Sequence, residues 1–239
     1  MAKLFPDASP KLKEDWKKMY DGYTIVSVTK ADMIYKKDEN GNLVPMTVQE
    51  VEQQGGDVGA LGVGSNSNYG ITVYITTAKV TGGSSYPTEW LLGGSFEWAN
   101  HPDVDEGNSV DAFVIGWYGG LAIKANSTSS VVHYNDGDKY PAVVTLTPNA
   151  GVGWEFNEAV DGFWSNSYAE SGSFSIKIIN STSDAGNIGN VIGQYNHSYE
   201  TKTLTSLGLS LSTSGGGFSI GWSTTTKVNT VPAYTTYTY

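Results

Sequence analysis

Residues 203–228 read TLTSLGLSLSTSGGGFSIGWSTTTKV, with apolar and small polar residues alternating on both sides of a glycine-rich centre. The apolar residues occupy every second position in Leu207–Leu211 and again in Phe218–Trp222, on either side of Gly215–Gly217. Successive side chains of a β-strand point to opposite faces, so this period of two is typical of strands. The segment therefore predicts a β-hairpin with one apolar face and one face of Ser, Thr and Gly.

The composition of the whole chain also favours sheets. The 239 residues include 29 Gly and 15 Tyr, and only 16% of them are charged. Much of the remainder is Ser, Thr and Asn, whereas long helices draw on Ala, Glu, Lys and Leu. The chain contains no Cys, which excludes disulfides and thiolate metal sites.

Charge limits the class of partner and suggests a location. All 14 basic residues are Lys, and the formal net charge of −10 excludes nucleic acid as the expected ligand, because nucleic acid needs a basic surface. Residues 1–37 hold eight Lys against five acidic residues, so a basic segment precedes an acidic body. The first residues lack the apolar core of a signal peptide, but the composition resembles that of exported bacterial proteins. We expect a secreted or cell-surface protein whose leader has been removed.

Two helices are predicted near the N-terminus. Ser9 suits an N-cap, Pro10 suits the first helical position and Gly22 suits the exit. Apolar residues recur at helical spacing between them, namely Leu12, Trp16, Met19 and Tyr20. The helix either packs on the β-body or lies on an anionic membrane, with Trp16, Lys17 and Lys18 in contact with lipid. A second helix, Val48–Gln54, has Thr47 and Glu50 at the spacing of a capping box.

Strands are expected at regular spacing along the rest of the chain. The segments are Tyr23–Lys30, Met33–Lys37, Ile71–Thr81, Gly94–Trp98, Val110–Trp117, Leu121–Ala125, Ser130–Tyr134, Pro141–Thr147, Gly153–Phe156, Ser173–Ile179, Val191–Thr201, Thr203–Ser212, Phe218–Val228 and Ala233–Tyr239. They predict an all-β, mainly antiparallel two-sheet sandwich-like fold with a short N-terminal helix. The Gly/Asn/Ser-rich residues 55–69 suggest an N-terminal helix and hairpin region, 1–55, and a main β-domain, 56–239. The terminal tails, Met1–Ser9 and Val228–Tyr239, are expected to be available for strand exchange with a neighbouring copy.

The sequence does not predict an enzyme. Gly217–Gly221 matches the pattern G-x-S-x-G, but Ser219 lies within an alternating strand and no acid or His follows it. The three histidines, His101, His133 and His197, are isolated in sequence, and we expect them at the surface. The nearest enzymatic alternative is a glycoside hydrolase, because three Glu residues adjoin Trp. Neighbours in a strand point to opposite faces, however, which favours core Trp beside outward Glu.

One acidic stretch could hold a cation. Within residues 103–111, the carboxylates of Asp103, Asp105 and Asp111 are spaced so that they could surround Ca²⁺. The stretch lacks the Gly and the closing Glu of an EF-hand at the required positions, so a solvated acidic loop is the alternative. No other cofactor is expected.

The tryptophans suggest a carbohydrate-binding or lectin-like module. Aromatic faces can stack on sugar rings, which makes Trp90, Trp98, Trp154 and Trp164 candidate platforms. The composition also looks like that of secreted jelly-roll glycosidases, although their Glu-x-Asp-x-Glu strand motif is missing.

The C-terminal part of the chain suggests a different function. A strand of about ten residues spans a bilayer when all its backbone groups are paired. The Ser/Thr/Gly-rich ribbon 203–228 resembles the inserting hairpins of β-pore-forming toxins, which implies that Phe218, Ile220 and Trp222 face lipid. A hairpin of a soluble sandwich shows the same alternation, so that alternative stays open.

These observations leave three functions of different classes. The leading prediction is a secreted bacterial, non-enzymatic, membrane-active or toxin-like protein whose partner is a lipid membrane. The second is a carbohydrate-binding module whose partner is a cell-surface glycan. The third is a self-assembling surface or filament subunit. A homo-oligomer is a further possible partnership, and the third function requires it.

Overall fold

The computed structural model describes residues 1–39, 43–53, 69–81, 88–100, 110–119, 121–147, 150–160, 167–180, 188–198, 204–210, 217–222 and 228–238. Its helices are α1 (Pro10–Met19) and α2 (Val48–Gln53). Its strands are β1 (Tyr23–Lys37), β2 (Leu43–Pro45), β3 (Tyr69–Val80), β4 (Thr88–Asn100), β5 (Val110–Tyr118), β6 (Ala122–Ile123), β7 (Ser129–Tyr134), β8 (Gly137–Lys139), β9 (Val143–Thr147), β10 (Gly151–Asn157), β11 (Ala159–Val160), β12 (Ser167–Asn180), β13 (Ile188–Ser198), β14 (Leu204–Ser210), β15 (Gly217–Trp222) and β16 (Val228–Thr238). The predicted all-β fold with a short N-terminal helix is confirmed.

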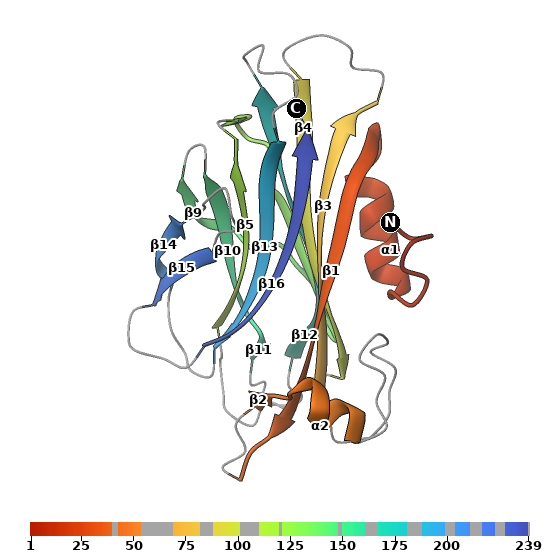
Figure 1. Cartoon of the computed structure of the whole chain (residues 1–239), viewed down its shortest axis with the longest axis vertical. Coiled ribbons are helices and arrows are strands. Elements are labelled where there is room, and N and C mark those ends of the chain that lie inside the picture. Colours follow the sequence, from red (N-terminus) through yellow and green to blue (C-terminus); the bar gives the residue numbers. More distant parts are fainter. Residues whose placement is uncertain are drawn as a thin grey trace.

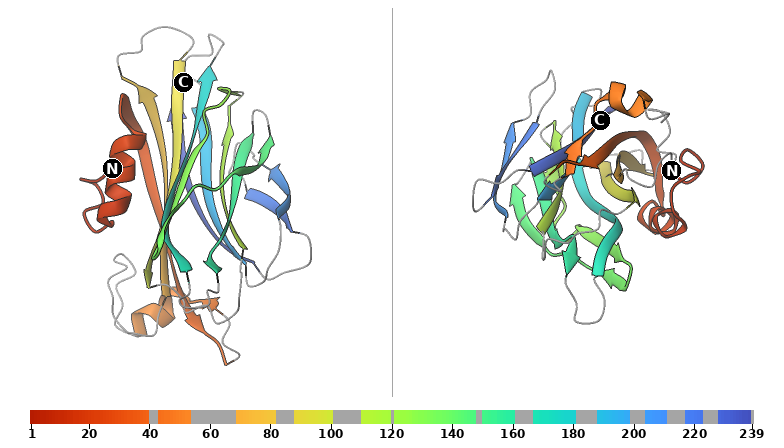
Figure 2. Two further views of the ribbon diagram at one scale, coloured as in Figure 1. Left: turned by 180° about the vertical axis from the view of Figure 1, so that it is seen from behind. Right: turned by 90° about the horizontal axis from the view of Figure 1, so that it is seen from below.

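Two antiparallel sheets form the body of the molecule (Figure 1). Sheet A has the order β2-β1-β3-β4-β12-β7-β8, with β6 and β11 also paired to β12. Sheet B has the order β16-β13-β5-β10-β9. The strands β14 and β15 form a separate two-stranded sheet, which lies on the opposite side of the body from α1 (Figure 2).

The N-terminal region belongs to sheet A through a single long strand. We predicted two strands there, but β1 runs unbroken through Asp32 and pairs with β3 from Tyr23 to Tyr35. Asp32 is accommodated because it accepts a hydrogen bond from Thr72 at 2.8 Å and pairs with Lys30 at 2.9 Å. The expected N-terminal region and the expected main domain thus share one hydrogen-bonded sheet.

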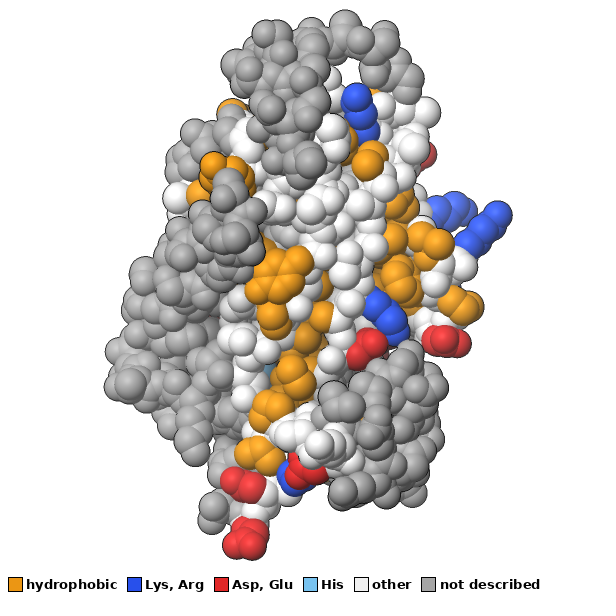
Figure 3. Space-filling model, in the orientation of Figure 1, with side chains coloured by type: hydrophobic (Ala, Val, Ile, Leu, Met, Phe, Trp, Pro, Cys, Tyr) orange, Lys and Arg blue, Asp and Glu red, His pale blue; other side chains and the backbone are white. Residues whose placement is uncertain are grey.

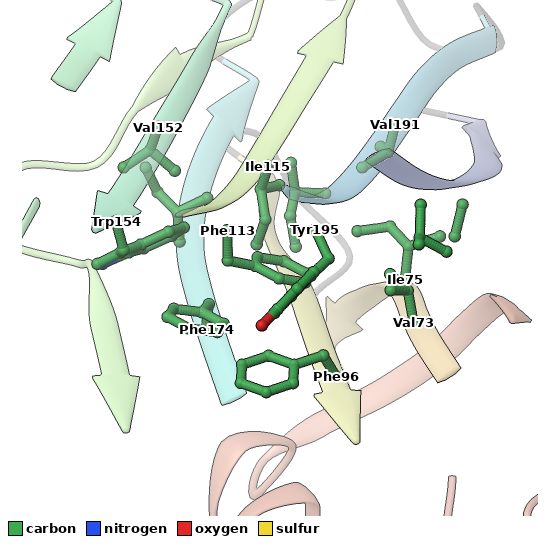
Figure 4. Packing of buried hydrophobic residues seen from close by; sticks show 14 of the residues in the cluster. Val73, Ile75, Phe96, Phe113, Ile115, Val152, Trp154, Phe174, Val191 and Tyr195 are labelled. Atoms are coloured by element: carbon green, nitrogen blue, oxygen red, sulfur yellow. The ribbon is translucent and has the colours of Figure 1, made fainter. Parts of the chain in front are cut away.

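Aromatic side chains fill the space between the sheets (Figure 4). The rings of Phe113 and Phe174 stack with centroids 4.6 Å apart, and Phe96 lies 4.7 Å from Tyr195. Gly94 makes this packing possible, because a Cβ at that position would stand 2.3 Å from the Phe113 ring. Each Trp of the three Glu/Trp neighbours is buried and its Glu is partly exposed, which confirms core Trp beside outward Glu.

One side of the sandwich is closed by contacts between β1 and β16. Ser27 donates a hydrogen bond to the carbonyl of Thr236 at 2.6 Å, and Thr235 donates one to Ser27 at 2.8 Å. The tail expected to be free for a neighbour is therefore paired within the chain, since β16 also forms a full ladder with β13. Apolar side chains follow this side of the surface (Figure 3), and the large exposed ones on the two strands are Val26 and Tyr234.

Both helices follow their sequence signals. Ser9 caps α1 by accepting a hydrogen bond from the Leu12 amide at 3.3 Å, and Gly22 adopts φ 78° beyond its end. In the capping box of α2, Thr47 and Glu50 exchange hydrogen bonds through their amides and side chains. Helix α1 packs on the outer face of sheet A, where Trp16 donates to Ser95 at 3.1 Å.

Candidate functional site

The ribbon, defined as β14 and β15, is the most distinct element of the fold. Its two strands pair with each other, and among the described residues they pair with no strand of sheet A or sheet B. It lies beside β9 and β10 (Figure 1). Ser219 is inside β15, opposite Gly208, so the strand-to-helix turn of a nucleophile elbow is not formed there.

The ribbon lies in sequence between two paired strands, and its first pair has their register. Strands β13 and β16 are antiparallel neighbours whose last pair is Ser198 with Val228. The first pair of the ribbon is Leu204 with Trp222, and two arms of five residues each, 199–203 and 223–227, separate it from the Ser198–Val228 pair. Because the two arms have equal length, the Leu204–Trp222 pair has the register of β13–β16, and the other pairs of the ribbon differ from it by one residue.

A β-bulge brings the apolar residues of the ribbon into phase. The register shifts by one residue between Leu204 and Ser206. Residues directly opposite each other in an antiparallel pair belong to the same face. The three apolar pairs therefore share one face of the ribbon, and they are Leu204 with Trp222, Leu207 with Ile220, and Leu209 with Phe218. Without the extra residue, Leu204 would belong to the polar face.

The outer face of sheet B is buried along β5 and β13, whereas Tyr234 on the same face of β16 is exposed. Along β5, the residues of the outer face alternate with the core residues Phe113 and Ile115. Along β13, they alternate with the core residue Tyr195. The buried residues of the outer face are Ala112, Val114, Ile192, Gln194 and Asn196. The Gln194 amide donates to Asn196 at 2.6 Å, which places a polar pair in this covered surface.

A buried ionic cluster lies at the root of the ribbon. His197 precedes the last residue of β13, and its Nδ1 is 2.9 Å from Glu158 Oε2 and 3.4 Å from Asp111 Oδ1. The Tyr195 hydroxyl donates to Asp111, and Trp98 Nε1 donates to that hydroxyl at 3.3 Å. Burial disfavours charge on the imidazole, but the two carboxylates outweigh this and raise the pKa of His197 well above its usual range.

The same cluster has the donor atoms of a metal site. Asp111, Glu158 and His197 each offer one ligand atom, and the three atoms lie within 4.8 Å of one another. Carboxylate and imidazole are ligands of divalent transition metals. A cation would need neutral His197, so protonation and metal binding are mutually exclusive at this cluster.

This arrangement corrects two sequence-based expectations. His133 and His197 are buried rather than at the surface, and His101 lies outside the described residues. Asp111 is a core residue facing His197 and Glu158, while the other calcium candidates, Asp103 and Asp105, lie outside the described residues. The partnership was missed because it depends on which strands pair, and no local motif encodes the pairing of β5 with β13.

The tryptophan candidates are in the core. Trp90, Trp98 and Trp154 are at most 6% exposed, so their ring faces are not open to a sugar, and Trp164 lies outside the described residues. Trp16 is also buried, between Phe5 and Tyr74, so its ring is not available to lipid in this structure. Lys17 and Lys18 are exposed. For Phe218, Ile220 and Trp222 the strand backbone is described and the side chains are not.

Comparison with known proteins finds weak structural neighbours. No protein-family model and no curated protein matches the chain. A structure described as a pore forming protein aligns at a TM-score of 0.34 and 7% identity, covering 89% of this chain and 95% of that chain. The Clostridium perfringens NetB toxin in its membrane inserted form gives 0.31 and 9%, covering 89% and 100%. A structure concerning Streptococcus parasanguinis adhesion by Fap1 fimbriae gives 0.31 and 6%, covering 87% and 94%.

Helices long and apolar enough to span a bilayer are absent from the described part of the chain.

Proposed function

We propose that this chain is a secreted, non-enzymatic, membrane-active bacterial protein that inserts residues 199–227 into a bilayer as a β-hairpin. The observation that carries the proposal is that the first pair of the ribbon, Leu204 with Trp222, has the register of β13–β16 across arms of equal length. If the ribbon leaves its place beside sheet B and residues 199–203 pair with 223–227, then β13 and β16 become the first parts of two longer strands that end in the ribbon. No existing strand pair has to break or slip for this extension.

The extended hairpin is long enough for the task. Its 29 residues form two limbs of about 14 residues each, which at about 3.3 Å per residue reach about 45 Å. The hydrocarbon core of a bilayer is about 30 Å thick. Backbone groups at the sides of the hairpin need partners within the membrane, so several copies must join their hairpins into a closed sheet.

The composition of the hairpin suits lipid on one face and water on the other. The charged residues of 199–227 are Glu200, Lys202 and Lys227, all close to the body, and residues 203–226 carry no charge. The apolar pairs of the ribbon share a face that would contact lipid, and the Ser, Thr and Gly residues would line the water-filled side. A charge at a mid-membrane position of the lipid face is costly, so its absence there favours insertion.

Matched substitutions on the two faces of β15 test the proposal. Ile220→Lys adds a charge to the apolar face, at a cost of about 2–4 kcal/mol in a bilayer, whereas Ser219→Lys adds it to the polar face. Calcein release from anionic and neutral liposomes at pH 5–8 is expected to fall at least about tenfold for Ile220→Lys and to stay within about twofold for Ser219→Lys. Melting temperatures identify variants that fail to fold.

Two results would reject the mechanism. One is the absence of calcein release by the wild-type protein under all these conditions. The other is unfolding of the soluble protein by Ile220→Lys, which would make the ribbon a fixed part of the body. A further variant keeps the test independent of side-chain packing. In it, residues 199–227 are replaced by Asn-Gly, so that a two-residue turn joins Ser198 to Val228 and closes the β13–β16 hairpin. We expect it to remain folded and to release no calcein.

The chain also permits a direct view of insertion. Because it contains no Cys, a single introduced Cys can carry an environment-sensitive fluorophore without competition from other sites. Labels at successive positions from 217 to 222 are expected to report lipid and water alternately once the protein is on liposomes. A uniform signal along this segment would contradict insertion as a strand.

A further inference from the structure

A groove of mixed polar and apolar lining lies on the other side of the molecule from the ribbon, between α1 and the outer face of sheet A. Its volume is about 680 Å³, and its lining comes from α1, β4, β7, β8, β12 and the segments around them. We call it the α1 groove and define it by six lining residues, which are Asp15, Ser129, His133, Asp138, Tyr140 and Ser175. Every one of them is a hydrogen-bonding residue.

A three-residue network gives the groove a fixed wall. His133 Nε2 lies 2.7 Å from Asp15 on α1, and its Nδ1 lies 2.7 Å from Asp138 on β8. The hydrogen bonds with Asp15 and Asp138 outweigh burial and raise the pKa of His133. Each of these hydrogen bonds uses one oxygen of a carboxylate. The second oxygen of Asp15 and of Asp138 is an acceptor that the network holds in place before any ligand arrives.

The floor of the groove offers hydroxyl groups. Ser129 and Ser175 face each other across β7 and β12, and both line the groove. Their hydroxyls make no hydrogen bond to any other described residue, in contrast with Ser130, which donates to the carbonyl of Pro141 at 2.6 Å. A pair of neighbouring hydroxyls can donate to and accept from one ligand group at the same time.

The charges of the residues that line the groove cancel. Three of the lining residues are lysines, which are Lys11, Lys18 and Lys177. With His133 charged, these lysines balance the four acidic residues of the lining, which are Glu14, Asp15, Asp21 and Asp138. A phosphate, a sulfate or a cation would meet no excess of opposite charge in the lining. An uncharged polar ligand does not depend on such an excess for its binding.

An aromatic ring completes the groove. Tyr140 lines it and is 75% exposed, which is the highest exposure among the large hydrophobic side chains described. An exposed ring beside fixed polar groups presents an apolar face with a hydroxyl at its end. The C–H face of a sugar ring matches such a surface, and the sugar hydroxyls match the Ser and Asp side chains.

We propose that the α1 groove binds an uncharged saccharide, which stacks on Tyr140 while its hydroxyl groups bond to Ser129, Ser175 and the carboxylates of Asp15 and Asp138. This site is separate from the ribbon and differs from the tryptophan platforms suggested by the sequence. It would give the protein a way to recognise a glycan at a cell surface.

The full-length protein can be tested on a printed array of neutral glycans, with sialylated and sulfated glycans printed as the charged comparison. We expect the wild type to retain at least one neutral glycan and to bind the charged ones less. The double variant Ser129→Ala/Ser175→Ala and the variant Tyr140→Ala should each weaken that binding at least about tenfold, as measured by titration with the free glycan. Tyr234→Ala, which alters an exposed tyrosine of β16 outside the lining of the groove, should change that binding less than about twofold.

Several outcomes would overturn the inference. These are retention of no neutral glycan, a preference for charged glycans, or binding unchanged by the groove variants. Tyr140 is too exposed for its replacement to unfold the protein, so loss of binding in Tyr140→Ala reports on the groove itself. Calcein release from glycan-free liposomes should be the same for the groove variants and the wild type, which separates a failure here from a failure of the membrane proposal.

Discussion

Helix α1 and the ribbon are both small additions to the β-body, on opposite sides of it, and they are attached in different ways (Figure 2). Helix α1 buries Leu12 and Trp16, donates a hydrogen bond to Ser95 and is joined to β7 and β8 through His133. The described backbone of the ribbon pairs only with itself, and its first pair has the register of the strands β13 and β16. In the proposed mechanism α1 stays fixed to the body and the ribbon leaves it.

Matched tryptophan truncations give the largest effect. Trp16→Ala should lower the free energy of unfolding by about 3–5 kcal/mol, because it removes a ring buried between sheet A and Phe5. Trp222→Ala on the ribbon should cost about 1 kcal/mol or less. Urea denaturation measures both values. Equal costs for the two variants would mean that the ribbon is held as firmly as the helix.

A smaller and pH-dependent effect is expected from His133→Gln. The pKa of His133 is raised in the folded protein, so the stabilisation by its carboxylate partners is fully present below the unfolded pKa of about 6.5. It is lost as the pH rises through the folded pKa. Solvent at Asp138 screens the network, so the loss at pH 6 should be about 1 kcal/mol and smaller at pH 9. If urea denaturation of wild type and variant shows the same dependence on pH, the network does not hold the helix.

The smallest effects are expected from the replacement of single serines, Ser9 at the start of α1 and Ser206 near the start of the ribbon. Ser9→Ala removes the N-cap of α1 and should cost about 1 kcal/mol, with faster hydrogen exchange in the first turn. Ser206→Ala on the ribbon removes no cap and should stay within about 0.5 kcal/mol. Faster exchange in the ribbon of Ser206→Ala, with none in α1 of Ser9→Ala, would contradict the comparison.

Local signals in the sequence predicted most of the elements but not their arrangement. The alternation and the turns located nearly all strands, and Ser9 with Pro10 located α1, because these features depend on neighbouring residues. The long strand β1 was divided in two since its partner for Asp32, Thr72, lies in β3. The order of the sheets, such as β12 beside β4 and β5 beside β13, depends on contacts between distant segments.

The candidate sites show the same limit. The sequence identified residues 203–228 as an amphipathic hairpin, but its register with β13–β16 requires knowledge of the pairing of Ser198 with Val228. Asp111 was chosen for its acidic neighbours, whereas its actual partners, His197 and Glu158, come from two other strands or their ends. The α1 groove could not be predicted, because its serines lie on strands that alternate like any half-exposed strand.

The equal arms at the root of the ribbon also bear on the speed of the proposed transition. Pairing of residues 199–203 with 223–227 begins at the existing pair Ser198 and Val228, so it extends a formed hairpin and requires no new loop closure. Hairpin pairing of this kind takes about 1–10 μs. We therefore expect the overall rate of insertion to be set by the meeting of several copies on the membrane, and to rise steeply with protein concentration.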